Sequence, residues 1–147
     1  MPYPIKASEV SASLRARLEQ IKPINGYSTD LQRVYEPDEN VPDGAPKPYS
    51  LIRPASDTRT GMASSQATRL RQFEIEFVFS KSAPLSAMDA VHVDVLRALG
   101  IGQDLYERIF PGLIEDEDEA TWRFAQKGET THSITITIGV TYVETYN

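Results

Sequence analysis

Residues 132–147 read HSITITIGVTYVETYN, and this stretch decides the fold that the sequence predicts. One set of alternate positions carries large apolar side chains, namely Ile134, Ile136, Ile138, Val140 and Tyr142. The positions between them carry Thr135, Thr137, Gly139, Thr141 and Val143. A period of two is typical of a β-strand that buries one face. The isoleucine face therefore belongs to a core, whereas the threonine face and the free edge of the strand have no evident cover within the chain.

A second alternating stretch, residues 70–80, predicts another half-buried strand. Its apolar positions are Phe73, Ile75, Phe77 and Phe79. Three shorter strands are expected, at 31–35, 49–54 and 120–126. Pro54 is expected to end the second of them, because proline cannot donate to a strand ladder. The residues KGET at 127–130 predict a turn that joins the third short strand to the terminal strand in a hairpin.

Two amphipathic helices are expected to cover this sheet. Near the N-terminus, apolar residues recur at helical spacing at Val10, Leu14, Leu18 and Ile21, with Ser8 as the expected N-cap. The second helix, residues 85–99, shows the same spacing at Met88, Val91, Val95 and Leu99. The pattern predicts an α+β fold in a single domain spanning residues 1–147, with a mainly antiparallel sheet of about five strands and two helices on one face.

Two long loops are expected, at residues 36–48 and 55–69, because neither segment has a core-forming pattern. They carry opposite charge, which suggests that they meet across a boundary between subunits. The expected cations are Arg53, Arg59 and Arg69. Their expected partners in a neighbouring copy are Asp38, Glu39 and Asp43. A neighbour is also expected to cover Thr135, Thr137 and Thr141, although a solvated threonine face remains the alternative.

The composition argues against several classes of function. The chain has no cysteine, so disulfides, thiolate catalysis and cysteine-bound zinc are excluded. Its net charge of −6 argues against a general nucleic-acid binder. The two histidines, His92 and His132, have no carboxylate at ligand spacing, so we expect no metal, no cofactor and no enzymatic activity. No apolar run reaches the length of a membrane span, and the N-terminus lacks the run of a secretory signal, which predicts a protein made and used in a cytosol.

The order of elements resembles the tail terminator, or tail completion, proteins of long-tailed bacteriophages. The segments that carry the resemblance are SASLRARLEQI, INGYSTDLQRVY, FEIEFVFS, AVHVDVLRALG and ITITIGVTYVETYN. The resemblance implies a hexameric ring at the head-proximal end of the tail tube. Such a ring ends tube polymerisation and offers the surface for head-tail joining.

The resemblance also implies the partners of this ring. They are further copies of the chain, the tail tube protein, a head-tail connector or stopper, and a sheath protein where one exists. Genome DNA would pass through the lumen without specific binding, in a protein found in the host cytoplasm during assembly and then in the virion. An acidic lumen suits that passage, because negative walls repel phosphate. The expected lining residues are Glu74 and Glu76, or Glu115, Asp116 and Glu117; the run 115–119 otherwise reads as a solvated loop.

Three alternatives remain open from the sequence. The nearest is another neck component, such as a head-closure stopper or an adaptor. The second is a monomeric α+β module that binds a small ligand or a peptide with its threonine face in water. The third is a hydrolase that uses Asp89 or His92.

Overall fold

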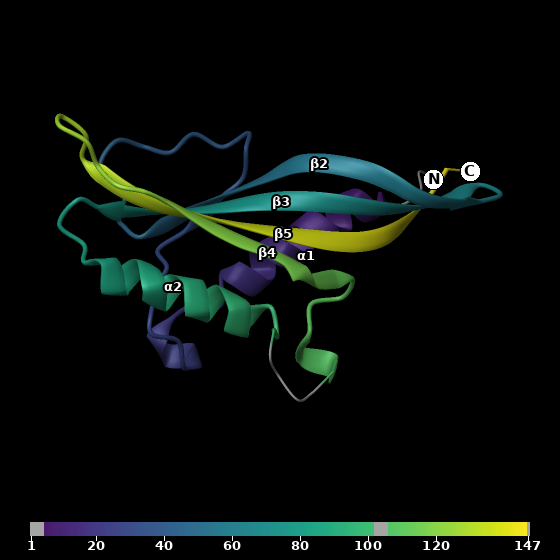
Figure 1. Ribbon diagram of the computed structural model, residues 1–147, viewed down its shortest axis with the longest axis horizontal. Helices are drawn as coiled ribbons and strands as arrows, with labels where there is room; N and C mark the ends of the chain where they lie inside the picture. The colour runs from purple at the N-terminus through teal and green to yellow at the C-terminus, as the bar shows by residue number, and fades with distance from the viewer. Residues whose placement is uncertain (1–4, 102–105, 147) are drawn as a thin grey trace.

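One five-stranded sheet organises the protein, in the order β1-β2-β3-β5-β4 (Figure 1). The computed structural model describes residues 5–101 and 106–146, except the side chains of residues 106 and 115–117. The strands are β1 (Val34–Tyr35), β2 (Tyr49–Ala63), β3 (Gln66–Ser80), β4 (Leu113–Arg123) and β5 (Thr131–Thr145). Only β1 and β2 are parallel, and the other three pairs are antiparallel. The predicted α+β fold with a mainly antiparallel sheet is confirmed.

The terminal strand lies inside the sheet and not at its edge. β3 pairs with β5 from Thr131 to Thr145, and β4 pairs with β5 from Ser133 to Val140. The prediction that the terminal strand has a free edge is therefore wrong over most of the length of the strand. Strand β4 takes the edge position and begins at Leu113, earlier than the predicted 120. The acidic run 115–119 belongs to this strand, which shifts its register between Ile114 and Glu119.

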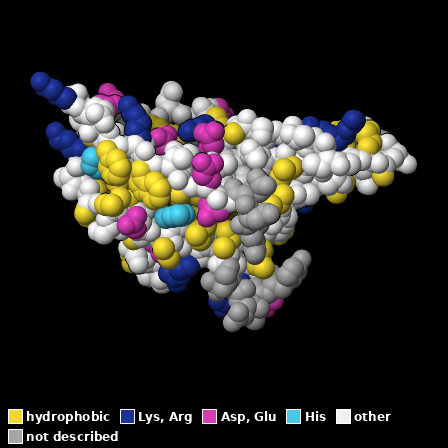
Figure 2. Space-filling model, viewed as in Figure 1, with side chains coloured by type: hydrophobic (Ala, Val, Ile, Leu, Met, Phe, Trp, Pro, Cys, Tyr) yellow, Lys and Arg dark blue, Asp and Glu magenta, His cyan; other side chains and the backbone are white. Residues whose placement is uncertain are grey.

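The predicted loop at 55–69 is also wrong, because these residues continue β2 and β3 as a long hairpin. Residues 55–63 and 66–71, together with residues 140–145 of β5, form an extension that we call the arm. Its hairpin tip projects beyond the helices (Figures 1 and 2). Ser64, with a φ of 51°, lies in the turn at its tip. Polar residues on both faces of the arm hide the alternation that identifies a half-buried strand.

The prediction that Pro54 ends β2 is wrong, because the backbone nitrogen of Pro54 faces the free edge of the sheet. Ser50 donates its backbone N–H to the carbonyl of Arg33, on the side away from β3. Backbone nitrogens alternate in direction along a strand, so those of Ile52 and Pro54 point to the same side as that of Ser50. The missing N–H of Pro54 therefore interrupts no hydrogen bond to β3. The segment 36–48 connects β1 to β2 without regular secondary structure.

Helices α1 (Lys6–Leu18) and α2 (Leu85–Ala98) cover one face of the sheet (Figure 1). Short 3-10 helices follow at Pro23–Asn25 and Tyr106–Arg108. The predicted N-cap at Ser8 is wrong, because α1 begins at Lys6 after Ile5. A distant carboxylate caps this helix instead, since Glu144 on β5 accepts hydrogen bonds from the backbone N–H groups of Lys6 and Ala7.

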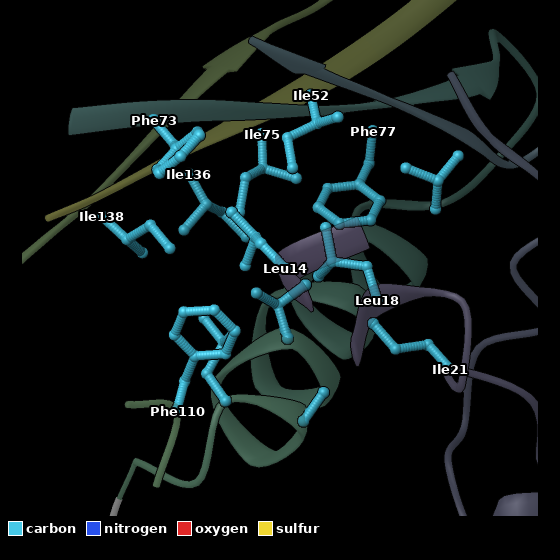
Figure 3. Packing of buried hydrophobic residues seen from close by; sticks show 14 of the residues in the cluster. Leu14, Leu18, Ile21, Ile52, Phe73, Ile75, Phe77, Phe110, Ile136 and Ile138 are labelled. Carbon is cyan, nitrogen blue, oxygen red and sulfur yellow. The ribbon is translucent and has the colours of Figure 1, made fainter. Parts of the chain in front are cut away.

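The core lies between the two helices and the inner face of the sheet (Figure 3). Ile75 is in register with Ile136, and Phe73 with Ile138. Helix α1 contributes Leu14 and Leu18, and α2 contributes Met88 and Val91. All eight side chains are almost completely buried. Each contributes about 1.5–3 kcal/mol relative to an exposed side chain, so the alternating apolar positions of β3 and β5 fix which face of the sheet the helices cover.

Candidate interaction surfaces

The face of the sheet opposite the helices, which we call the outer face, is covered by no helix (Figure 1). In one row across it, Arg53 is in register with Glu74, Glu74 with Thr137, and Thr137 with Glu119. In the next row, Glu76 is in register with Thr135, which is in register with Thr121. Thr135, Thr137 and Thr141 are each half-buried in the single chain. Their cover by a neighbouring subunit stays a prediction.

Arg53 neutralises part of the outer face within its own chain. Its Nη2 lies 3.0 Å from Oε2 of Glu74, and its Nη1 lies 3.4 Å from Oε1 of Glu76. Arg53 therefore has acidic partners on the adjacent strand, in addition to any that a neighbouring copy would supply. Glu74 and Glu76, the first two expected lining residues, are half-buried on the outer face, and their place in a lumen stays a prediction. The other expected lining residues, Glu115, Asp116 and Glu117, have side chains outside the described part of the structure.

A polar cluster joins the three strands of the arm. The carboxylate of Asp57 on β2 accepts hydrogen bonds from the guanidinium groups of Arg69 and Arg71 on β3 and from the hydroxyl of Tyr142 on β5. The Arg71 bond measures 2.7 Å from Nε to Oδ2. Arg69 also donates to the hydroxyl of Tyr146 at 3.2 Å. These bonds tie the arm together and engage Arg69 within its own chain, and its pairing with a neighbouring copy stays a prediction.

The cluster lowers the pKa of one of its side chains, Asp57, and raises the pKa of another, Tyr142. Burial raises the pKa of Asp57, but the hydrogen bonds from Tyr142, Arg69 and Arg71 outweigh burial and hold that pKa below its usual value. Burial, followed by the hydrogen bond to Asp57, raises the pKa of Tyr142 to about 12. Asp57 is thus a stable anion at neutral pH, and Tyr142 remains a hydrogen-bond donor.

Of the remaining predicted interface residues, one forms ion pairs within the chain and three form none with the residues that the structure describes. Glu39 forms ion pairs with Arg33 at 2.8 Å and with Arg15 at 2.9 Å. The hydrogen bond from the backbone N–H of Glu36, followed by the bonds to Arg33 and Arg15, holds the pKa of Glu39 below its usual value. Exposed Arg59 has one hydrogen bond among the residues that the structure describes, from its Nη1 to the sulfur of Met62 at 3.4 Å. Asp38 and Asp43 are exposed on the loop 36–48, and no ion pair joins either to a described residue.

An aromatic patch beside the edge strand β4 was missed as a site from the sequence. Trp122 is 41% exposed and Phe124 is 44% exposed. The Trp122 ring meets the ring of His92 edge to face, with centroids 6.3 Å apart, and Phe124 meets His132 in the same way at 5.5 Å. Figure 2 shows hydrophobic and histidine side chains gathered beside acidic ones on this face of the molecule. The alternation of Trp122 and Phe124 was visible in the sequence, but the edge position of their strand was not.

Groups suited to metal binding do not converge in the described residues. No set of three or more His, Cys, Asp or Glu side chains among them is arranged to hold a metal ion. Asp89 is exposed on α2, and His92 is half-buried, with its Nε2 3.7 Å from Oδ2 of Asp118. An open groove of about 470 Å³ lies between α1 and the segment 110–112. None of the helices within residues 5–101 and 106–146 is both long and apolar enough to cross a membrane.

Comparison with known proteins does not assign the chain to a family. No family model matches the chain, and no curated protein matches its sequence. The surfaces that remain for a function are the arm, the outer face, the loop 36–48 and the edge strand β4 with its aromatic patch.

Proposed function

We propose that this chain is a structural virion protein that forms a hexameric ring at the head-proximal end of a phage tail tube. In that position it ends tube polymerisation and presents the surface to which the head is joined. The observation that carries the proposal is the arm, whose hairpin part at residues 55–66 extends from the body, whereas Val140 and Tyr142 at its base belong to the core. Exposed sheet extensions of this kind favour pairing with another chain, which is what assembly of a ring requires.

The inventory of surfaces fits a protein that joins other proteins. A terminator must match the tube end on one side and refuse further tube subunits on the other, which needs different chemistry on its surfaces. The outer face is lined by threonines and ion-paired side chains, whereas the patch beside β4 exposes Trp122 and Phe124. The loop 36–48 exposes the carboxylates of Asp38 and Asp43, which form no ion pair with any residue that the structure describes. These surfaces supply distinct contacts for the tail tube protein, a connector or stopper, and a sheath protein where one exists.

Electrostatics also supports passage of DNA through such a ring. The net charge is −6. Glu74, Glu76 and Glu119 lie on the uncovered outer face, and Arg53 offsets only part of their charge. An outer face turned toward the lumen would repel phosphate and keep the genome from adhering. That orientation makes Glu74 and Glu76 lining residues and is part of this proposal.

Deletion of the coding gene in its phage tests the function. Overlong or headless tails, seen by negative-stain electron microscopy, are expected when the terminator is absent. Tails of normal length beside heads that leak DNA would instead favour the alternative, a head-closure stopper. Complementation with the intact gene is the control, because it must restore tail length before any variant is interpreted.

A further inference from the structure

The sheet has two open edges, and they lie on opposite sides of it (Figure 1). On one side, β1 pairs only with Ser50 and Leu51 of β2. Within the part of the chain that the structure describes, residues 55–63 have no backbone partner other than β3. On the other side, β4 pairs with β5 alone. Each edge presents unpaired backbone donors and acceptors to the surroundings.

The hairpin and the strand that carry the two edges differ in net charge. In the hairpin segment 55–71, Arg59 lies on the edge strand β2 and Arg69 and Arg71 lie on β3, against the single carboxylate of Asp57. Strand β4 has five consecutive acidic residues, 115–119, against Arg123. Two of these acidic side chains are described, and those of Asp118 and Glu119 both lie at the surface. An edge of the first kind attracts an edge of the second kind and repels its own copy.

Bulges restrict where either edge accepts a strand. The register of β2 shifts between Pro54 and Ser56 and again between Arg59 and Gly61. The register of β4 shifts between Ile114 and Glu119. Such irregularities protect an edge from indiscriminate pairing. The longest regular segments that remain are 56–59 on the arm part of β2 and 119–123 on β4. Each carries one anion and one cation, Asp57 and Arg59 on the first and Glu119 and Arg123 on the second, so opposite charges can face each other between copies.

We propose that residues 56–59 of one copy pair with residues 119–123 of the next copy, so that the sheet continues from subunit to subunit. This inference rests on the proposed ring, and it names the contact that builds it. Pairing between opposite edges of one sheet is head-to-tail, the arrangement that closes into a ring when the rotation between subunits allows it. The added strand also lies beside Trp122 and Phe124 and covers part of the aromatic patch, which is exposed in the single chain.

Cysteine cross-linking tests this contact cleanly, because the chain contains no cysteine. Thr58 and Thr121 are exposed residues within the two segments, so the double variant T58C/T121C places one thiol on each edge. Head-to-tail pairing predicts covalent ladders of three or more chains under a short bismaleimide reagent. Each single variant is expected to give no product longer than a dimer. The control pair T58C/S86C moves the second thiol to an exposed position on α2 and is expected to give no ladder.

A charge swap gives an independent readout. Trp122 is the only tryptophan, so its fluorescence reports cover of the β4 edge. A blue shift is expected as protein concentration rises and copies assemble. Arg59→Glu is expected to raise about tenfold the protein concentration at which half of the blue shift has occurred. Adding Glu119→Arg is expected to restore it, whereas Lys127→Glu, the same charge change at an exposed turn residue, is expected to leave it unchanged.

The outcomes separate the contact from the function. Assembly without ladders in T58C/T121C, or equal ladders in T58C/S86C, overturns the edge pairing. If the purified chain stays monomeric, the same reaction is run on assembled tails, where absence of ladders also overturns it. Overlong tails after gene deletion together with absent ladders would refute this contact and leave the terminator function standing. Normal tail length together with ladders would refute the function and leave the contact standing.

Discussion

The carboxylate of Glu144 caps the first helix, with its Oε2 2.9 Å from the backbone nitrogen of Lys6. The partners are 138 positions apart in sequence, so this bond links the end of the last strand to the start of α1. It supplies an acceptor for an N–H group that has none within the helix, and it places a negative charge at the positive end of the helix dipole. A side chain on the arm therefore helps to hold α1 on the sheet.

Loss of this cap is expected to destabilise the fold measurably. Glu144→Ala removes both the acceptor and the charge and should lower the free energy of unfolding by about 1 kcal/mol, the usual value of an N-cap. Glu144→Gln keeps an acceptor and should lose about half as much. Thr145→Ala, at the neighbouring exposed position, is the control. Urea unfolding followed by circular dichroism measures all three, and equal stability of Glu144→Ala and the parent would contradict the capping role.

Asp57→Asn is expected to loosen the arm in a pH-dependent way. The anion accepts three charge-assisted or hydroxyl hydrogen bonds, so its loss should cost about 2 kcal/mol at neutral pH. Because the pKa of Asp57 is lowered by folding, its contribution is present above the unfolded-state pKa of about 4 and is lost as pH falls through the folded-state pKa. The stability difference between parent and variant should therefore shrink below pH of about 4. A difference that stays constant at acidic pH would contradict this assignment.

Tyr142 gives a second titration of the same cluster. Folding raises the pKa of Tyr142 from its ordinary value near 10 to about 12. The stabilisation is complete below the unfolded-state value and is lost as pH rises through the folded-state value. Absorbance of phenolate should show a late-titrating tyrosine in the folded parent that is absent in Tyr142→Phe, whereas Tyr49, whose pKa burial also raises, should still titrate late in that variant. In Asp57→Asn this tyrosine should titrate earlier, and an unchanged titration would contradict the hydrogen bond.

Gly112 is required where the chain enters β4. Its φ is +82°, and a Cβ there would lie 2.1 Å from the carbonyl oxygen of Thr141. Gly112→Ala should therefore cost more than about 3 kcal/mol, from backbone strain and a clash with backbone atoms. Gly44, with a φ of +73° and open space around it, is the matched control, and its alanine variant should cost only about 1 kcal/mol. Similar unfolding midpoints for both variants would show that the close approach to Thr141 is relaxed in solution.

Arg59 and Arg69 are expected to behave differently although both belong to the arm. Arg69→Glu breaks the bond to Asp57 and places two carboxylates together, so it should lower the unfolding midpoint clearly. Arg59→Glu has no ion pair to break among the described residues and should change stability by less than about 0.5 kcal/mol. Its effect should appear in assembly instead. Strong destabilisation by Arg59→Glu would show that this residue has a structural role within the single chain.

The sequence predicted the core of this fold because burial leaves a periodic signal. Phe73, Ile75 and Phe77 on β3, and Ile134 and Ile136 on β5, alternate as half-buried strands do, and all five are buried. The same signal contains no information on which strands are neighbours. The terminal strand was therefore predicted to have a free edge, although β4 pairs with it from Ser133 to Val140.

The arm shows the limit of periodicity most clearly. Residues 55–63 have polar side chains on both faces, so nothing in their pattern distinguishes a strand from a loop. The bonds that hold them, such as those of Asp57 to Arg71 and Tyr142, join distant parts of the chain. Charge alone predicted that Arg69 and Glu39 would take partners, and both do, but within the chain. The identity of a partner depends on strand register, which sequence pattern does not supply.

Tube polymerisation in the presence of the purified protein tests the proposed function most directly. Tail tube protein is polymerised with increasing amounts of this chain, and tube lengths are measured by negative-stain electron microscopy. A terminator predicts that mean tube length falls as its proportion rises, with a ring at one end of each tube. Arg59→Glu should weaken this effect and Lys127→Glu should preserve it. Tube lengths that do not change at any proportion of the protein, with no ring at either end, would contradict the proposal that it ends tail growth.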